Sequence, residues 1–194
     1  RETLEKRATF LADIPFSDMA AYKAILERTP TPYHIQISNS APIRYAQLFP
    51  AKAGWQVFCN RGTSGIDGST STAIGASVVQ ATPTLLITGD LSFFYNSNAL
   101  WCNYIPKNLK IIVVNNAGGG IFRILPTDKG TPFFETFQET THSLTAKHLC
   151  AMYGFTYLCA QNQEELTKTL ETFFSQYESP MLLEVFTPRE LNHT

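Results

Sequence analysis

Charged residues are scarce in this chain of 194 residues. Asp, Glu, Lys and Arg make up 16% of it, against about 25% in an average soluble domain. The formal net charge is −1 at pH 7 and no block of like charges occurs, so neither a nucleic acid nor an anionic membrane is indicated as a partner. With so few charges to spread over the surface, we expect an extensive part of it to be buried in an interface.

Cysteine motifs and long apolar runs are also missing. The cysteines Cys59, Cys102, Cys150 and Cys159 form no CxxC pair and have no metal-ligand spacing, which argues against a disulfide scaffold or a zinc site. No apolar run approaches the roughly 20 residues that a membrane span needs. The opening residues "RETLEKRATFLADIP" are too polar for a signal peptide. We therefore expect a cytoplasmic protein with reduced thiols and no membrane span.

Six apolar segments predict β-strands, and several of them are continuously apolar, as strands covered on both faces are. They span residues 33–38, 55–60, 84–89, 110–116, 156–160 and 181–186. Helical patterns span residues 17–28, 41–49, 68–80, about 93–105, 143–153 and 162–176, with Ser17 and Asn162 as expected N-caps. This alternation predicts an α/β fold of three layers, α/β/α, around a six-stranded parallel sheet. The irregular stretch 125–142 exceeds the usual loop length, as functional lids and partner contacts often do.

Polar and glycine-rich motifs follow the first four strands. They read "SNSAPIRYAQLF", "RGTSGIDGSTSTAIG", "GDLSFF" and "NNAGGGIF". Ligands of parallel α/β folds bind at the carboxyl ends of the strands, near a point where the strand order reverses. We therefore expect the chemistry of this chain to be concentrated at one edge of the sheet.

Asp90 and Asn116 each end an apolar strand, so a parallel sheet brings them to the same edge. A carboxylate and an amide oxygen suit Mg²⁺, which is usually shared with phosphate groups. Gly118 to Gly120 let the backbone approach a ligand and offer N–H groups to an anion. Alternatively, Asp90 caps a helix and the Asn–Gly segment is an ordinary turn. Together the residues favour a diphosphate bridged by a divalent cation.

The spacing of these residues resembles that of the thiamine-diphosphate enzymes. Gly89-Asp90 is followed by 24 residues and then by Asn115-Asn116, and the signature of the family is GDG, a gap in the mid-twenties, and NN. The resemblance implies thiamine diphosphate as cofactor and Mg²⁺, with Mn²⁺ as an alternative, held by Asp90, Asn116 and the carbonyl of Gly118. The third position of the signature is Leu91 here instead of Gly.

The four motifs together look like one branch of this family, a synthase of menaquinone biosynthesis in which GDLS replaces GDG. This closer resemblance runs from about Ser17 to the end of the chain. It implies a transferase that decarboxylates 2-oxoglutarate and adds the succinyl unit to isochorismate. Two rivals stay open: another carboligase or decarboxylase of the same cofactor class, similar to acetolactate synthase, and a non-catalytic binding module. The absence of GxGxxG and GxxxxGK[ST] motifs argues against dinucleotide and P-loop sites.

The resemblance also implies roles for individual residues. Both substrates are carboxylates, which a guanidinium binds in a bidentate manner, and the substrate contacts would be Ser40, Arg44, Arg61, Phe122 and Leu125. The cofactor contacts would be Ile66, which supports the bent cofactor, with Gly89, Asp90, Leu91, Ser92, Asn116, Gly118, Gly119 and Ile121. The alternatives are a helix cap for Ser40, surface ion pairs for the arginines and core packing for the apolar residues. No role is assigned to His34, His142, His148 or His193.

Enzymes of this family bind the cofactor between a diphosphate half and a pyrimidine half, usually from different subunits. The pyrimidine half supplies a glutamate that activates the cofactor. No segment here resembles that half, so we expect residues 17–194 to be the C-terminal diphosphate domain of a longer protein, with 1–16 as a linker. The full-length protein would be a homodimer or homotetramer, and this chain alone would be inactive.

Overall fold

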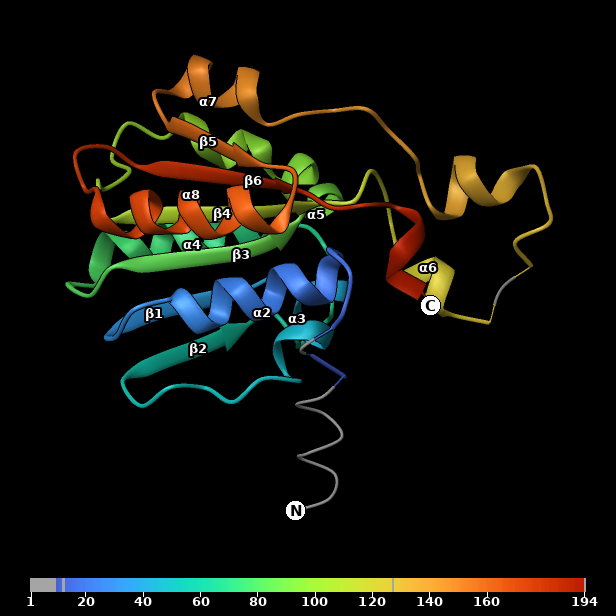
Figure 1. Ribbon diagram of the computed structural model, residues 1–194. Helices are drawn as coiled ribbons and strands as arrows, with labels where there is room; N and C mark the ends of the chain where they lie inside the picture. The colour runs from blue at the N-terminus through green and yellow to red at the C-terminus, as the bar shows by residue number, and fades with distance from the viewer. Residues whose placement is uncertain (1–9, 12, 127, 194) are drawn as a thin grey trace.

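The computed structural model describes residues 10–11, 13–126 and 128–193. Its centre is a sheet of six parallel strands in the order β2-β1-β3-β4-β6-β5 (Figure 1). The strands are β1 (Tyr33–Ile37), β2 (Trp55–Cys59), β3 (Thr84–Gly89), β4 (Leu109–Asn115), β5 (Thr156–Ala160) and β6 (Met181–Phe186). Each begins and ends within one residue of its predicted bounds, so the predicted parallel sheet is confirmed.

Helices cover both faces of the sheet and complete the predicted three layers. They are α2 (Asp18–Arg28), α3 (Ala41–Ala46), α4 (Ser69–Val79), α5 (Asp90–Tyr95), α6 (Ile121–Ile124), α7 (Lys147–Tyr153) and α8 (Gln163–Ser175). The helices α2, α3 and α8 contribute to one hydrophobic core, and α4, α5 and α7 belong to the other face. The side chains of β4 pack alternately into the two cores: Ile112 and Val114 belong to the first, and Ile111 and Val113 belong to the second. No helix in the described part of the chain is long and apolar enough to cross a membrane.

The two predicted N-caps are confirmed. The Ser17 hydroxyl accepts a hydrogen bond from the backbone N–H of Ala20 at 3.4 Å, and the Asn162 side chain accepts one from Glu165 N at 2.9 Å. Each satisfies an N–H group that the first helical turn leaves without a partner. The caps fix where α2 and α8 begin.

The helix predicted over 93–105 is wrong. The structure has α5, which begins at Asp90, followed by a 3-10 helix at Ser97–Trp101. The break falls at Asn96, whose side-chain oxygen accepts a hydrogen bond from Ser71 N at 2.8 Å, in the first turn of α4. The predicted helices at 41–49 and 143–153 are shorter than expected, ending at Ala46 and beginning at Lys147.

The carboxyl ends of β1, β3 and β4 meet at one edge of the sheet. The chain passes from β1 outward to β2 and returns to β3 on the opposite side of β1, which makes the space beside β1 and β3 a switch point of the kind where ligands bind. Ser38, just after β1, donates its N–H to Ile87 O of β3 at 2.9 Å. Figure 1 shows α6 and the segment 125–142 beyond this same edge.

The sequence predicts an irregular stretch over 125–142, but the segment is not wholly irregular. It contains a π-helix at Phe134–Gln138. Backbone hydrogen bonds anchor the end of the segment to the chain after β4: Gly119 N donates to Glu139 O at 2.6 Å, and His142 N donates to Ala117 O at 3.3 Å. The segment therefore lies against the glycine-rich turn at the edge of the sheet.

Candidate functional site

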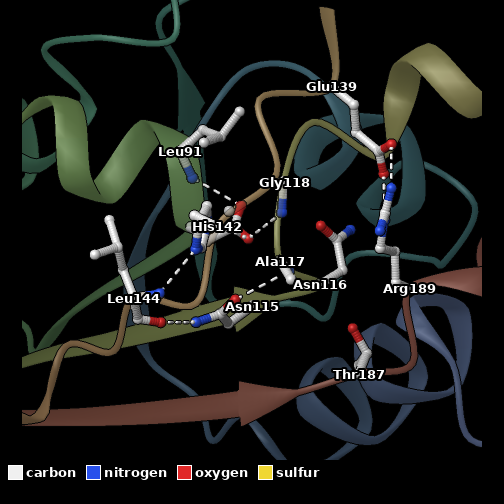
Figure 2. Close-up of polar contacts among 12 residues, drawn as sticks. Leu91, Asn115, Asn116, Ala117, Gly118, Glu139, His142, Leu144, Thr187 and Arg189 are labelled. Atoms are coloured by element: carbon white, nitrogen blue, oxygen red, sulfur yellow. Dashed lines mark hydrogen bonds and ion pairs between the residues drawn. The ribbon is translucent and has the colours of Figure 1, made fainter. Parts of the chain in front are cut away.

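Asp90 lies at the junction of β3 and α5 and is 3% exposed. Its Oδ1 accepts a hydrogen bond from Leu91 N at 2.7 Å, and its Oδ2 accepts one from Gly118 N at 2.9 Å (Figure 2). The second bond joins the end of β3 to the glycine turn after β4. The carboxylate is therefore held in one orientation between two strand ends.

Asn116 follows β4 and is 7% exposed. Its side-chain Nδ2 donates to Asp18 Oδ2 at 2.8 Å, whereas its Oδ1 is buried and has no hydrogen-bond partner among the described residues. A buried carbonyl oxygen without a partner costs about 1–3 kcal/mol, and such a group in a native protein calls for a missing donor, water or cation. The amide oxygen is thus available to a ligand.

The glycines after Asn116 are required by close contacts. A Cβ at Gly120 would lie 2.8 Å from the side-chain nitrogen of Asn116, and a Cβ at Gly118 would lie 2.9 Å from Glu139 O. Gly118 also has φ of +150°, in a region that side chains disfavour. Any larger residue at either position would displace Asn116 or the segment 125–142.

Ala117, between these residues, has φ of +62°. This is the left-handed region, which costs a non-glycine residue about 1 kcal/mol or more. The conformation is supported by a hydrogen bond from Ala117 N to Asn115 Oδ1 at 3.1 Å (Figure 2). Backbone strain of this kind gathers at functional sites.

His142 contacts the same carboxylate, although sequence reasoning gave it no role. Its Nε2 lies 3.1 Å from Asp90 Oδ2. Its Nδ1 accepts a hydrogen bond from Leu144 N at 3.1 Å, so Nδ1 carries no proton and Nε2 is the nitrogen that donates to Asp90. Phe94 packs edge-on against the ring at 5.5 Å between centroids. No local motif marks His142, because the contact depends on how the segment 125–142 folds back.

Glu139 clamps that segment in place. It is 1% exposed, and Arg189 Nε lies 2.9 Å from its Oε1 (Figure 2). Arg123 Nη2 lies 2.8 Å from its Oε2, so both arginines hydrogen-bond to the carboxylate. Burial alone would raise the pKa of Glu139, but the hydrogen bonds and charges of Arg189 and Arg123 outweigh it and lower that pKa. Glu139 therefore carries a negative charge and ties α6 and the chain after β6 to the segment.

These residues surround a pocket at the edge of the sheet. Most of the predicted site residues line it, namely Ser40, Ile66, Gly89, Asp90, Leu91, Ser92, Asn116, Gly118, Gly119, Ile121 and Phe122. Gly120, named among the glycines of the turn, lines it too, and further lining residues that sequence reasoning missed include Asp18, Tyr22, Asn39 and Pro42. Ser92 Oγ donates to Ile66 O, so α5 anchors the turn that presents Ile66. The structure thus gathers four separate motifs around one space.

Three predicted residues do not line the pocket. Arg44 is exposed and donates from Nη1 to Ser40 O at 2.8 Å. Arg61 is exposed and donates from Nη1 to Asn39 Oδ1 at 3.3 Å. Both arginines are therefore bonded to residues that do line the pocket. Leu125 is 40% exposed after α6.

Ser40 is not a helix cap, contrary to the alternative considered for it. It precedes α3, but its side chain makes no capping hydrogen bond, and its φ is +75°. A serine in the left-handed region is strained. Its place on the pocket wall is not explained by helix capping.

The oxygens that face this pocket suit a hard divalent cation. Three residues that line it carry such oxygens: the Asp90 carboxylate, the Oδ1 of Asn116 and the Gly118 carbonyl, which accepts one hydrogen bond from Gly120 N at 3.0 Å and has a second lone pair. Burial raises the pKa of Tyr22, and the charges of Asp18, Tyr45 and Asp90 raise it further, as expected where negative charge is concentrated. The described residues contain no group of three His, Cys, Asp or Glu that could hold a metal, so a bound ion would depend on the amide and the carbonyl.

Comparisons with known proteins show the family to which the sequence is similar. Residues 40–185 match the family described as thiamine pyrophosphate enzyme, C-terminal TPP binding domain. The chain is 55% identical over 188 residues to the 2-succinyl-5-enolpyruvyl-6-hydroxy-3-cyclohexene-1-carboxylate synthase of Flavobacterium psychrophilum, covering 97% of this chain and 34% of the relative. It is 53% identical to the synthase of the same name from Christiangramia forsetii, covering 94% and 32%. The chain spans about a third of the length of these curated relatives.

Proposed function

The chain belongs to the thiamine pyrophosphate enzymes, as a C-terminal TPP binding domain, and we propose that it is the diphosphate-binding part of a synthase that joins 2-oxoglutarate to isochorismate. One observation carries the proposal: four motifs from different strand ends, all similar to those of the synthases, line one pocket together with a buried amide oxygen that has no hydrogen-bond partner in the described part of the chain. The names of the relatives support the choice of reaction.

In this proposal the diphosphate of the cofactor binds at the glycine turn through a magnesium ion. Asp90, Asn116 and the carbonyl of Gly118 are the protein ligands, because they supply three hard oxygens at one edge. Leu91 and Ser92 lie in the first turn of α5, whereas Gly119 N–H already donates a hydrogen bond to Glu139 O at 2.6 Å. When bound, thiamine diphosphate supplies a carbanion nucleophile, and the protein supplies position and charge.

The apolar wall of the pocket has a separate role. Ile66, Ile121 and Phe122 line the pocket, and we assign Ile66 to supporting the bent cofactor. Phe122 and Leu125 are assigned to the substrate side. These side chains exclude water from the reacting atoms, which strengthens every electrostatic interaction there.

Substrate carboxylates are assigned to the rim of the pocket. Arg44 and Arg61 are exposed there and carry permanent positive charge, and each is held by a hydrogen bond to a lining residue. Each guanidinium has further N–H groups that can bind a carboxylate in a bidentate manner. Two such cations favour a dicarboxylate donor such as 2-oxoglutarate over pyruvate, and Ser40 completes the contact.

The remaining part of the pocket is assigned to a pyrimidine-binding domain of the same protein, contributed by a second subunit of a homodimer or homotetramer. The low content of charged residues and the exposed aromatic side chains of Trp101 and Tyr104 are consistent with such an interface. Size measurements on the full-length protein would test this part of the proposal.

The cofactor assignment is tested by binding, and the reaction by product analysis. In the full-length protein, thiamine diphosphate with Mg²⁺ should raise the melting temperature, because a ligand that binds only the native state stabilises it, whereas ATP or NAD should not. Replacing Asp90 with Ala should remove the Mg²⁺-dependent part of this increase. Incubation with isochorismate and either 2-oxoglutarate or pyruvate then distinguishes the synthase from an enzyme similar to acetolactate synthase. A product that forms only with pyruvate would overturn the assigned reaction.

A further inference from the structure

The side chain of Asp18 is buried beside the proposed metal ligands, although it belongs to a distant part of the sequence. Asp18 is the first residue of α2 and is 2% exposed. Its Oδ2 accepts a hydrogen bond from Asn116 Nδ2 at 2.8 Å, and its Oδ1 accepts one from Thr187 Oγ1 at 2.5 Å. Figure 2 shows Thr187 on the chain after β6, with its hydroxyl directed toward the region of Asn116. Both carboxylate oxygens thus bind donors from the chain after two different strands.

A carboxylate can only accept hydrogen bonds, whereas the amide of Asn116 has a donor side and an acceptor side. The contact with Asp18 therefore requires the NH₂ group of Asn116 to face α2. The amide oxygen must then point the opposite way. That oxygen is the buried Oδ1 that has no partner among the described residues, and both residues line the same pocket.

The direction of the amide matters for a metal because only its oxygen is a ligand for Mg²⁺. Rotation of the amide by half a turn would present an NH₂ group to the cation. We propose that Asp18 is a positioning residue: it fixes the side-chain amide of Asn116 so that Oδ1 faces the cation that carries the cofactor diphosphate. This inference rests on the proposed function, because it concerns the same site.

Thr187 supports this arrangement from the other side. Its hydroxyl donates to Asp18 Oδ1, and its N–H donates to Asn115 O at 3.0 Å. Thr187 is thus fixed to the end of β4 while it holds Asp18. Outer partners of metal ligands orient them in this manner, and losing one typically weakens metal binding about 10- to 100-fold.

A double-mutant cycle on the full-length protein separates this role from a general structural one. The probe is Mg²⁺, titrated calorimetrically in the presence of thiamine diphosphate. Asp18→Ala should weaken Mg²⁺ binding about 10- to 100-fold, because the amide can then rotate. Asp13→Asn serves as a matched control, since Asp13 is an exposed carboxylate close to α2; this variant should bind Mg²⁺ like the wild type.

The second arm of the cycle starts from Asn116→Asp. A carboxylate presents an oxygen in both directions and needs no orienting partner, so adding Asp18→Ala to this variant should cost less than threefold in Mg²⁺ affinity. Loss of the same factor in both backgrounds would mean that Asp18 acts through charge or overall structure, and would overturn the inference. Melting temperatures of all variants identify those that do not fold.

The wild-type titration distinguishes a failure of the proposed function from a failure of the role proposed for Asp18. Should the wild-type protein bind no thiamine diphosphate in response to Mg²⁺, the proposed function and the role of Asp18 would fall together. If the wild type binds but Asp18→Ala leaves its Mg²⁺ affinity unchanged, only the role of Asp18 is overturned.

Discussion

His142 Nε2 lies 3.1 Å from Asp90 Oδ2 and donates a hydrogen bond to it. The carboxylate also accepts hydrogen bonds from the backbone N–H groups of Leu91 and Gly118. The two oxygens of Asp90 are thus oriented by the helix that it begins, by the glycine turn and by the segment 125–142. The support from segment 125–142 is the side chain of His142, which a substitution can remove.

Replacing His142 with Ala should weaken the Mg²⁺-dependent binding of thiamine diphosphate about tenfold in the full-length protein, because Asp90 loses one of the donors that orient it. His148→Ala is the matched control, since His148 is exposed on α7. Calorimetric titration of the cofactor measures both variants. Equal affinities for His142→Ala and wild type would show that the backbone donors alone orient Asp90.

The clamp at Glu139 predicts a change in local stability. Glu139→Gln removes the charge that Arg123 and Arg189 share, so we expect a loss of about 1–3 kcal/mol in the free energy of unfolding and faster proteolysis within residues 128–138. Limited proteolysis followed by mass spectrometry locates the cleavage. Glu164→Gln, at an exposed position in the first turn of α8, is the control. Cleavage of both variants at the wild-type rate would contradict the assignment of Glu139 as the clamp.

The same residue predicts a pH dependence. The pKa of Glu139 is lower in the folded chain than its ordinary value of 4.5, so the unfolded state binds its proton more tightly. The stabilising contribution is therefore complete above about pH 5 and is lost as pH falls through the folded pKa. Urea unfolding from pH 6 down to pH 3 should show a steeper loss of stability for wild type than for Glu139→Gln. An equal loss of unfolding free energy in the two proteins as pH falls would contradict the lowered pKa of Glu139.

Lys110 predicts a further rise of stability with pH, in the alkaline range, because its pKa is also lower in the folded chain. It is fully buried on β4, where its Nζ donates to Gln176 O at 2.5 Å and lies 4.4 Å from the ring centroid of Tyr177. Burial lowers its pKa from 10.5 to about 8. The folded state thus binds the proton less tightly, so the charged side chain costs stability below pH 8, and this cost disappears as pH rises from 8 to 10.5.

Lys110→Met tests this directly, because methionine fills a similar volume without a charge. The free energy of unfolding of the variant should exceed that of wild type most clearly near pH 7, and this difference should disappear by pH 10. At higher pH the variant should become the less stable of the two, because it lacks the hydrogen bond to Gln176 O at every pH. Chemical unfolding at four pH values measures the difference. A constant difference across that range would contradict the lowered pKa.

The strands could be predicted from the sequence, because residues covered on both faces form continuous apolar runs, as in β4. The presence of Asp90 and Asn116 around one pocket followed from the parallel arrangement of the strands. The helix after Asp90 could not be placed, because the break at Asn96 depends on its bond to α4. Asp18 and His142 were missed for a similar reason: their partners lie 98 and 52 positions away along the chain, where no periodicity or motif relates them.

The 194-residue chain by itself should not catalyse the synthase reaction. The resemblance to the thiamine-diphosphate enzymes implies that the glutamate that activates the cofactor comes from a pyrimidine half, and the chain spans only about a third of the length of its relatives. We expect no product from 2-oxoglutarate and isochorismate when the purified 194-residue chain is assayed with thiamine diphosphate and Mg²⁺, whereas the full-length protein should be active. Turnover by the chain alone would mean that the residues described around Asp90 and Asn116 activate the cofactor without that glutamate.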